Sequence, residues 1–268
     1  MPTMKYYAVG SIGAYEMSSE NFDEGKNYRK IMEIYFQSMN NLYDKTKNDV
    51  IKEIIEKYDL KGKTVLDVGC GGGYWTRFFV EHGAEVYALD VNPSKVKAAI
   101  LYLKRKNMAD KACFFASEVT SLNLKINFDL IFAKDVIEHV KDDVLFLRKL
   151  SSLLKSKGVI ILSTQNAFSL NFLIEGCFNR ALGNKDWCGW DPTHLRFYTL
   201  WSLRRKAEAA SLKISKYYGS YHIPYRFITN IIYHKVYEHR AFHILDKHYD
   251  KFPVDVSGWA LICEIKKK

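Results

Sequence analysis

Hydrophobic and polar positions alternate along most of the chain in two patterns. Short apolar runs bounded by turn residues predict buried strands, and apolar residues three or four positions apart predict amphipathic helices. Strands are predicted at residues 65–68, 85–90, 112–116, 128–133, 159–163, 213–218 and 258–265. Helices are predicted between them, at residues 26–58, 74–82, from 93 onward, from 143 to a close at 157–158, and at 200–210. This order predicts an α/β fold: a doubly wound, Rossmann-like, mostly parallel seven-stranded sheet with helices on both faces.

The first predicted strand runs into a glycine-rich turn. Its glycines are Gly69, Gly71, Gly72 and Gly73, and Asp67 precedes them within the strand. Glycine tolerates positive φ and has no Cβ, so a small ligand can approach the backbone and the amino end of the next helix. A second acid, Asp90, ends the second strand, where a carboxylate can hold ribose hydroxyl groups. Because Asp67 would repel a pyrophosphate, the turn favours a cationic ligand over a dinucleotide.

The arrangement D-x-G-x-G-x-G from Asp67 to Gly73 resembles motif I of the class I S-adenosylmethionine-dependent methyltransferases. The resemblance extends over about residues 60–214 and includes Asp90. It implies S-adenosyl-L-methionine as the cofactor, with Asp90 on the ribose, Glu118 on the adenine and the carbonyl of Lys134 on the ammonium group. The implied cofactor-binding residues are Asp67, Gly69, Cys70, Gly71, Asp90, Val91, Glu118, Val119 and Lys134.

Asp135, Glu138 and His139 follow the fourth strand in the segment D-V-I-E-H-V. Positions i, i+3 and i+4 share one face of a helical turn, so the three side chains are expected to converge. The segment is similar to the E-x-x-E-H segment of the ubiquinone-biosynthesis O-methyltransferases, in which a divalent cation is bound. The resemblance implies that the trio binds Mg²⁺ and polarises an acceptor oxygen, with Asp135 and His139 in catalytic roles. Local hydrogen bonding is the alternative.

A second candidate for the chemistry is the segment D-P-T-H-L-R at residues 191–196. His194 has a pKa range suited to a general base, and Arg196 can hold an anionic acceptor by a forked contact. Similar D-P-T-H-x-R-F segments occur at this point in the resembled family. A purely structural role is the alternative for His194.

The predicted function is methyl transfer to an oxygen of a small molecule: a phenol, a sugar hydroxyl or a phosphate-like oxygen. The net charge of +10 mildly favours an anionic acceptor. The charge also fits a nucleic-acid methyltransferase, but the N/D-P-P-Y segment of base amino-group methylases does not follow the fourth strand. No nucleic acid is therefore expected as a partner. A non-catalytic module that binds the same cofactor would also fit the glycine-rich turn, and a dehydrogenase fits it more distantly.

One domain of four parts is expected. These are an N-terminal arm and helical cap at 1–58, a cofactor-binding core at 59–214, a substrate-side insertion before the last strand at 215–255, and the last strand and tail at 256–268. Residues 1–25 and 167–192 are expected to be irregular. Tyr15, Tyr28 and Arg29 are candidates for covering the cofactor or the substrate, with surface aromatic residues next to a core helix as the alternative. The aromatic stretch 221–252 is expected to roof the substrate site or, alternatively, to make contacts in a homodimer.

Cysteine usage and hydropathy bear on the cellular location. Five cysteines show no C-x-x-C pair, so neither a disulfide framework nor a zinc site is expected. The amino terminus lacks a long apolar segment, and no apolar run approaches the length of a transmembrane helix. A cytoplasmic protein without a transmembrane segment is expected.

Overall fold

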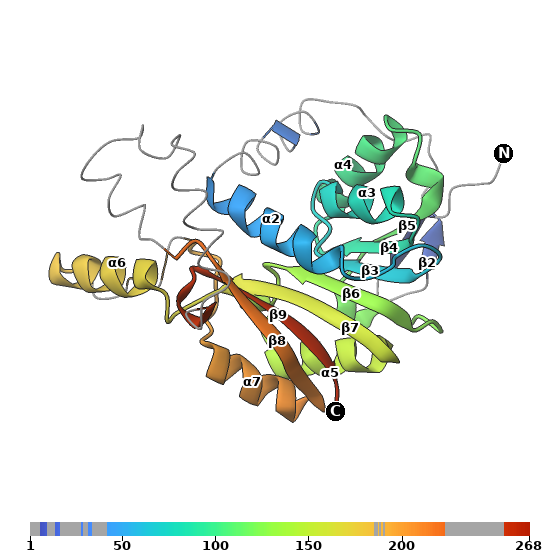
Figure 1. Ribbon diagram of the computed structural model, residues 1–268. Coiled ribbons are helices and arrows are strands. Elements are labelled where there is room, and N and C mark those ends of the chain that lie inside the picture. Colours follow the sequence, from blue (N-terminus) through green and yellow to red (C-terminus); the bar gives the residue numbers. More distant parts are fainter. Residues whose placement is uncertain are drawn as a thin grey trace.

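In the computed structural model, the described part of the chain comprises residues 6–9, 14–16, 28, 32–33, 42–184, 187, 189, 191–222 and 255–268. These residues build a mixed β-sheet covered by helices on both faces (Figure 1). The strands are β1 (Tyr6–Val9), β2 (Ala14–Glu16), β3 (Thr64–Val68), β4 (Glu85–Asp90), β5 (Ala112–Ala116), β6 (Phe128–Lys134), β7 (Leu154–Gln165), β8 (Leu212–Ser220) and β9 (Ala260–Lys267). The α-helices are α2 (Leu42–Ile55), α3 (Tyr74–Glu81), α4 (Pro93–Lys104), α5 (Asp143–Leu153), α6 (Leu170–Ala181) and α7 (Leu200–Ala209). Short 3-10 helices are η2 (Ala109–Lys111), η3 (Val119–Ser121), η4 (Ile137–His139) and η6 (Asp255–Ser257).

The strand order places the predicted first strand, β3, at the centre of the sheet. The described strands lie in the order β2-β1-β5-β4-β3-β6-β7-β9-β8. Neighbours from β5 to β7 are parallel, whereas β9 runs antiparallel to both β7 and β8. The predicted α/β fold with seven mostly parallel strands is therefore confirmed by β3 to β9. The carboxyl ends of β3, β4, β5 and β6 meet at one edge, which is where such sheets bind their ligands.

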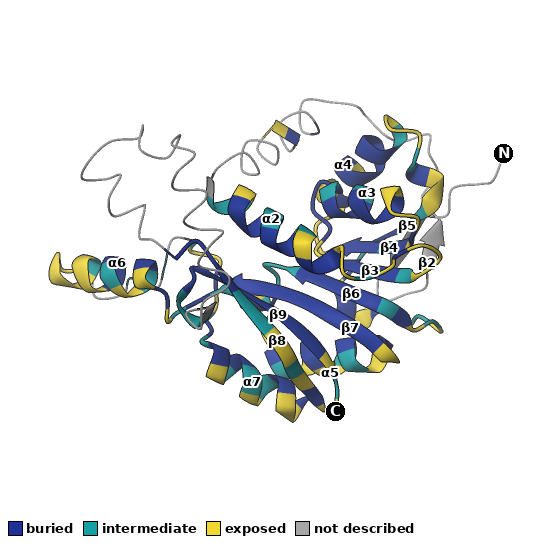
Figure 2. Ribbon diagram, viewed as in Figure 1, coloured by how far each residue is buried: buried dark blue, intermediate teal, exposed yellow. Residues whose placement is uncertain are grey.

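Helices pack on both faces of the sheet and create two hydrophobic cores (Figure 2). One core joins α2, α3 and α4 to the sheet and includes the fully buried Ile51, Phe79 and Ala99. The other joins α5 and α7 to the opposite face and includes Leu147 and Leu203. Burial of these apolar stripes, each side chain contributing about 2 kcal/mol, holds the central strand ends in place.

Two segments that were expected to be irregular contain regular structure. In residues 1–25, β1 pairs in parallel with β5, and β2 pairs antiparallel with β1. In residues 167–192, α6 begins after Ser169, whose hydroxyl accepts a hydrogen bond from the Phe172 N–H at 3.1 Å. The expectation of irregular structure is wrong at both places. Backbone pairing is enough to hold a short edge strand, so β1 and β2 leave little signal in the side-chain pattern.

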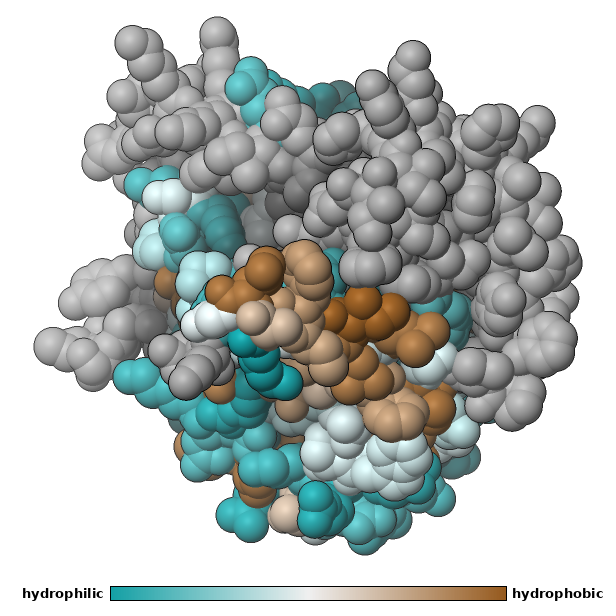
Figure 3. All heavy atoms as spheres, turned by 90° about the vertical axis from the view of Figure 1, so that its left-hand side faces the viewer, coloured by the Kyte–Doolittle hydropathy of each residue, from teal (hydrophilic) through white to brown (hydrophobic). Residues whose placement is uncertain are grey.

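Helix α6 projects from one side of the sheet (Figure 1). Its buried residues are Asn171, Glu175 and Gly176, whereas Leu173 and Phe178 are exposed. Figure 3 looks onto this side of the molecule and shows apolar side chains gathered there. Because its inward face is polar and its outward face partly apolar, α6 lacks the periodic pattern from which a helix is predicted.

Predicted helix boundaries are confirmed where a capping residue marks them. Asn92 caps α4 through the Ser94 N–H, with Pro93 at the first position, and Asp142 caps α5 through the Leu145 N–H. The expected end of α5 at 157–158 is wrong, because β7 begins at Leu154.

The aromatic stretch 221–252 lies outside the described residues except for its first two, and the proposed division into four parts stays a prediction. Among the described helices, none combines the length and the apolar character needed to cross a membrane.

Candidate functional site

The glycine-rich turn between β3 and α3 exposes backbone at the ligand-binding edge. Gly69, Gly71 and Gly73 all have positive φ, of 75°, 53° and 86°. A Cβ on Gly69 would stand 2.6 Å from the Val136 Cγ2, and one on Gly73 would stand 2.9 Å from the Ala99 Cβ. Neither position accepts a side chain, so the turn is a compact cradle of bare backbone.

Two carboxylates flank this turn. Asp67 is 1% exposed, and its Oδ2 accepts a hydrogen bond from the Thr76 hydroxyl at 2.6 Å. Burial, with a contribution from the charge of Asp90, raises the pKa of Asp67 to about 7. Asp90 accepts hydrogen bonds from the Gly71 N–H at 3.1 Å and the Asn92 N–H at 2.9 Å. Since the hydroxyl partner of Asp67 is neutral, a cationic ligand bound nearby would stabilise its charged form.

The other predicted cofactor residues lie at the same edge in different environments. Cys70 and Val119 are buried, and burial raises the pKa of the Cys70 thiol well above its usual value. Val91 is 66% exposed, and the exposed Glu118 accepts a hydrogen bond from the Thr120 hydroxyl at 3.3 Å. Lys134 ends β6, next to the turn. The structure thus places all nine residues along the ends of β3, β4, β5 and β6.

Asp135 sits in a charged network, not predicted from the sequence, that joins it to side chains of α2, β6 and β7. It has a positive φ of 54° and pairs with the buried Lys47 from α2. The Lys134 ammonium lies 3.1 Å from the same carboxylate, and the Ser163 hydroxyl donates to it at 3.0 Å. Although burial opposes it, the charges of Lys47 and Lys134 hold the pKa of Asp135 well below its usual range. Lys47 stands four residues before the buried Ile51, so helical spacing places both side chains on the inner face of α2. This spacing is the signal from which a buried lysine could have been predicted.

Asp135, Glu138 and His139 do not converge, so this expectation is wrong. Glu138 is fully buried and turns toward Thr164, whose hydroxyl donates to its Oε2 at 3.0 Å. Burial and the charge of Asp135 raise the pKa of Glu138 to about 8. His139 is exposed and faces Thr193 instead. Side chains at i, i+3 and i+4 converge on an α-helix, whereas η4 is a single 3-10 turn and Asp135 lies outside it.

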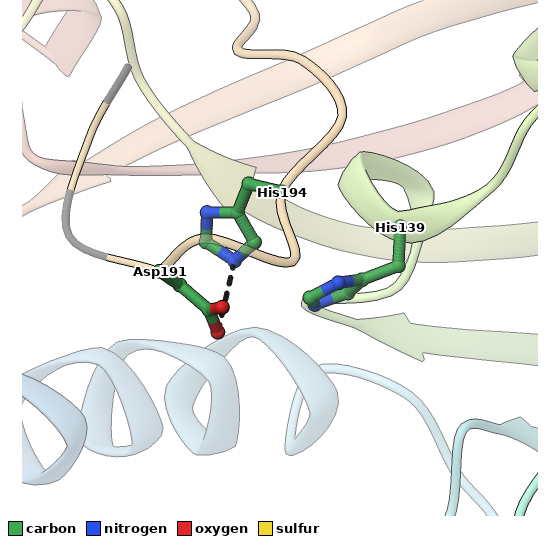
Figure 4. Close-up of side chains that lie close together, drawn as sticks. All are labelled: His139, Asp191 and His194. Atoms are coloured by element: carbon green, nitrogen blue, oxygen red, sulfur yellow. Dashed lines mark ion pairs between the residues drawn. The ribbon is translucent and has the colours of Figure 1, made fainter. Parts of the chain in front are cut away.

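The loop at residues 191–196 meets η4 at this edge (Figure 4). The Leu195 N–H donates to the Glu138 carbonyl at 2.9 Å, which ties the loop to η4. His194 is 9% exposed, its Nε2 lies 3.7 Å from Asp191 Oδ2, and its ring centroid lies 4.7 Å from that of His139. Burial and the neighbouring His139 lower the pKa of His194, although Asp191 opposes the shift. The structure therefore brings together one residue of each predicted catalytic segment, His139 and His194.

Arg196 is held by contacts within the protein. Its guanidinium lies 3.0 Å from Asp143 Oδ2 and donates to the Lys141 carbonyl at 2.6 Å. Asp143 also accepts from the Tyr198 hydroxyl at 3.0 Å and pairs with Lys206 at 3.1 Å. Arg196 therefore anchors the loop to α5, and its contact with an anionic acceptor stays a prediction.

A doubly wound sheet whose glycine turn and second-strand acid meet at the carboxyl edge defines a Rossmann-like cofactor-binding protein. A family profile described as "Methyltransferase domain" matches residues 39–217, which include this turn, η4 and the loop at 191–196. The chain belongs to the class I S-adenosylmethionine-dependent methyltransferases.

Curated relatives include ubiquinone biosynthesis O-methyltransferases. The protein of that name from Nitrobacter winogradskyi is 31% identical over 173 residues, which cover 62% of this chain and 62% of the relative. The one from Rickettsia bellii is 29% identical over 165 residues, which cover 59% of this chain and 68% of the relative. The chain thus matches less than two thirds of the length of the Nitrobacter protein.

Solved structures share the fold at low sequence identity. A S-adenosylmethionine-dependent methyltransferase from Clostridium acetobutylicum superposes with a TM-score of 0.60 and 16% identity, covering 90% of this chain and 98% of the other. Magnesium protoporphyrin IX methyltransferase from Synechocystis, solved with bound S-adenosylhomocysteine, gives a TM-score of 0.57 and 15% identity, covering 92% of this chain and 90% of the other.

Proposed function

We propose that this protein transfers a methyl group from S-adenosyl-L-methionine to an oxygen of a small-molecule acceptor. The observation that carries the proposal is the side-chain-free turn flanked by the buried carboxylates of Asp67 and Asp90. The family membership supplies the reaction class, and the names of the curated relatives favour oxygen as the atom methylated.

The residues at the sheet edge fit this cofactor. When bound, S-adenosylmethionine supplies a methyl group on a positively charged sulfur. Gly69 and Gly71 would leave room for its amino-acid portion, and Asp90 would accept from the ribose hydroxyls. Glu118 would accept from the adenine amine, and the Lys134 carbonyl would accept from the ammonium group. Cys70, Val91 and Val119 would line the pocket, and the charge of Asp67 would favour the cationic ligand over a neutral one.

On the acceptor side, His194 is the group proposed to contact the reacting hydroxyl. It belongs to a partly enclosed cluster with His139 and Asp191, next to the end of β6. Holding the acceptor in line with the methyl carbon is the main task of such a site, because proximity supplies most of the rate. The acceptor oxygen belongs to a phenol, a sugar hydroxyl or a phosphate-like group. The net charge of +10 favours an anionic acceptor among these classes.

Magnesium binding by Asp135, Glu138 and His139 is not part of this proposal. Glu138 is buried against Thr164 and His139 faces Thr193, so the three side chains do not offer one ion a common site. The cytoplasmic location and the homodimer rest on the sequence alone and stay predictions.

The experiment is a methyl-transfer assay with labelled cofactor and a panel of phenols, sugars and phosphorylated sugars. His194→Ala is expected to lower turnover at least about 100-fold, because it removes the group next to the reacting oxygen. Its affinity for S-adenosylhomocysteine should stay within about twofold of wild type, since His194 belongs to the loop at residues 191–196 and not to the glycine turn. His82→Ala, an exposed histidine at the end of α3, is the matched control and should keep full turnover. Near-normal turnover of His194→Ala, or no labelled product from any acceptor, would contradict the proposal.

A further inference from the structure

His139, Asp191 and His194 form a cluster of ligand atoms that combines residues from both predicted catalytic segments. Each of the three side chains offers one ligand atom, and these atoms all lie within 4.8 Å of one another. Among the described residues, no other group of three His, Cys, Asp or Glu side chains meets this criterion. His139 comes from η4, and the other two come from the loop at residues 191–196. Figure 4 shows the three side chains directed toward one another across the gap between these elements.

Thr193 orients two members of the cluster. Its hydroxyl donates to Asp191 Oδ1 at 2.6 Å, and its N–H donates to the same oxygen at 2.8 Å. Asp191 Oδ2 is left to face His194 Nε2 at 3.7 Å. One carboxylate oxygen of Asp191 is therefore fixed by the loop, and the other points into the cluster.

Thr193 also decides which nitrogen of His139 can bind a ligand. The His139 Nδ1 lies 3.3 Å from the Thr193 carbonyl and 3.2 Å from its hydroxyl. A carbonyl only accepts, and this hydroxyl already gives its proton to Asp191, so Nδ1 must carry the hydrogen of the imidazole. The tautomer assigned by this network leaves the lone pair on Nε2. Metal-bound histidines are commonly oriented in this way, with the second ring N–H donated to a carbonyl or carboxylate.

We propose that His139 Nε2, Asp191 Oδ2 and His194 Nε2 bind one divalent transition-metal ion. Two imidazoles with one carboxylate suit Zn²⁺, Fe²⁺, Co²⁺ or Ni²⁺, whereas Mg²⁺ takes oxygen ligands. The donor set therefore shares only His139 with the Mg²⁺ trio expected from the sequence, and it prefers a different metal. Bonds of about 2.0–2.2 Å require the ligand atoms to draw together from their present separations of up to 4.8 Å.

Three protein ligands leave coordination positions open for water or an added oxygen ligand. If the proposed function holds, such a position would receive the oxygen of the acceptor, and His194 would then act on that oxygen through the ion and not by direct contact. The binding of the metal itself is independent of that role and can be measured without an acceptor.

The test titrates tag-free protein, stripped with a chelator, with ZnCl₂ by calorimetry and with CoCl₂ by visible absorption. Wild type should bind one ion per chain with a dissociation constant in the micromolar range or below, and Co²⁺ should show d–d bands. His139→Asn, Asp191→Asn and His194→Asn should each weaken binding at least about 10-fold. Thr193→Val removes the hydroxyl that holds Asp191 Oδ1 but keeps the carbonyl beside His139 Nδ1, and it should weaken binding less, up to about 10-fold. His82→Asn, at a distant exposed histidine, should bind as wild type.

Unfolding in urea of the metal-free variants separates loss of the site from loss of the fold, since each variant should unfold at nearly the wild-type concentration. The absence of bound ion in wild type, or binding that His139→Asn and His194→Asn leave unchanged, would overturn the site. Methyl transfer measured in parallel distinguishes the two proposals. A protein that binds the ion but transfers no methyl group would support the metal site and contradict the proposed function. A protein that transfers the methyl group but binds no ion would support the proposed function and contradict the metal site.

Discussion

The cofactor side and the acceptor side of this sheet edge are built in different ways. On the cofactor side, the glycine turn and its two acids lie between Asp67 and Asp90, and the N–H groups of Gly69 and Cys70 both donate to the Leu89 carbonyl at 2.8 Å. On the acceptor side, His139 and His194 come from segments far apart in the chain. These segments meet through the bond from the Leu195 N–H to the Glu138 carbonyl and through the contacts of His139 with Thr193. Contacts within one strand–turn–helix unit and its neighbouring strand fix the first side, and contacts between distant segments fix the second.

The largest effect is expected where the cofactor side is most tightly packed. In Gly73→Ala, the new Cβ would meet the backbone and Cβ of Ala99 at 3.0 and 2.9 Å, at a φ of 86°. Left-handed strain and overpacking together should lower the free energy of unfolding by about 3 kcal/mol. Gly62→Ala is the matched control, because Gly62 has a φ of 69° with nothing within 4 Å. It should lose only about 1 kcal/mol in urea unfolding, and equal losses would contradict the packing argument.

An effect of opposite sign is expected at Asp67. The carboxyl has a pKa of about 7 in the folded protein, above its value in the unfolded chain. Ionisation therefore favours the unfolded state between about pH 4 and 7, and the cost is complete above pH 7. Asp67→Asn removes this cost and should raise the free energy of unfolding by about 2 kcal/mol at pH 8, with no gain at pH 3.

The same substitution should weaken binding of S-adenosylmethionine, because it removes a negative charge beside a cationic ligand. Wild-type affinity should increase as the pH rises from 6 to 8, and Asp67→Asn should lose that dependence. Calorimetry at the two pH values measures both quantities. If Asp67→Asn changes neither the free energy of unfolding nor the affinity, the raised pKa of Asp67 is contradicted.

A smaller effect is expected on the acceptor side, where Asp143 binds the loop through Arg196. Asp143→Asn should lower the free energy of unfolding by about 1.5 kcal/mol at pH 7, since it weakens hydrogen bonds to charged partners. Although burial opposes it, the bonds from Lys206, Tyr198 and Arg196 lower the pKa of Asp143. The stability it contributes is therefore present above about pH 4 and is lost as the pH falls through the lowered pKa.

Urea unfolding of wild type and Asp143→Asn between pH 7 and pH 2 checks this prediction. The difference between the two proteins should shrink only below about pH 4. Lys206→Met, which removes a largely exposed partner of the same carboxylate, is the control and should cost less than Asp143→Asn. A difference that stays constant down to pH 2 would contradict the role of the ionised carboxylate.

The contrast between the two sides explains what the sequence could predict. A strand, a turn and a helix that follow one another leave a local pattern, so the fold and the position of Asp67, Gly69 and Asp90 at one edge were predicted. Glu138 turns inward because Thr164 of β7 offers it a hydroxyl, and Asp135 meets Lys47 across 88 positions of sequence. Spacing within one short segment cannot predict partners that lie this far away in the sequence. This is why the expected convergence of Asp135, Glu138 and His139 was wrong.

Titration of the purified protein with S-adenosylhomocysteine in a calorimeter, with NAD⁺ as the comparison ligand, tests most directly whether the glycine turn and its two carboxylates hold the methyl donor. The expected result is one molecule of S-adenosylhomocysteine bound per chain and no heat with NAD⁺. No heat with S-adenosylhomocysteine, or an equal response to NAD⁺, would contradict it.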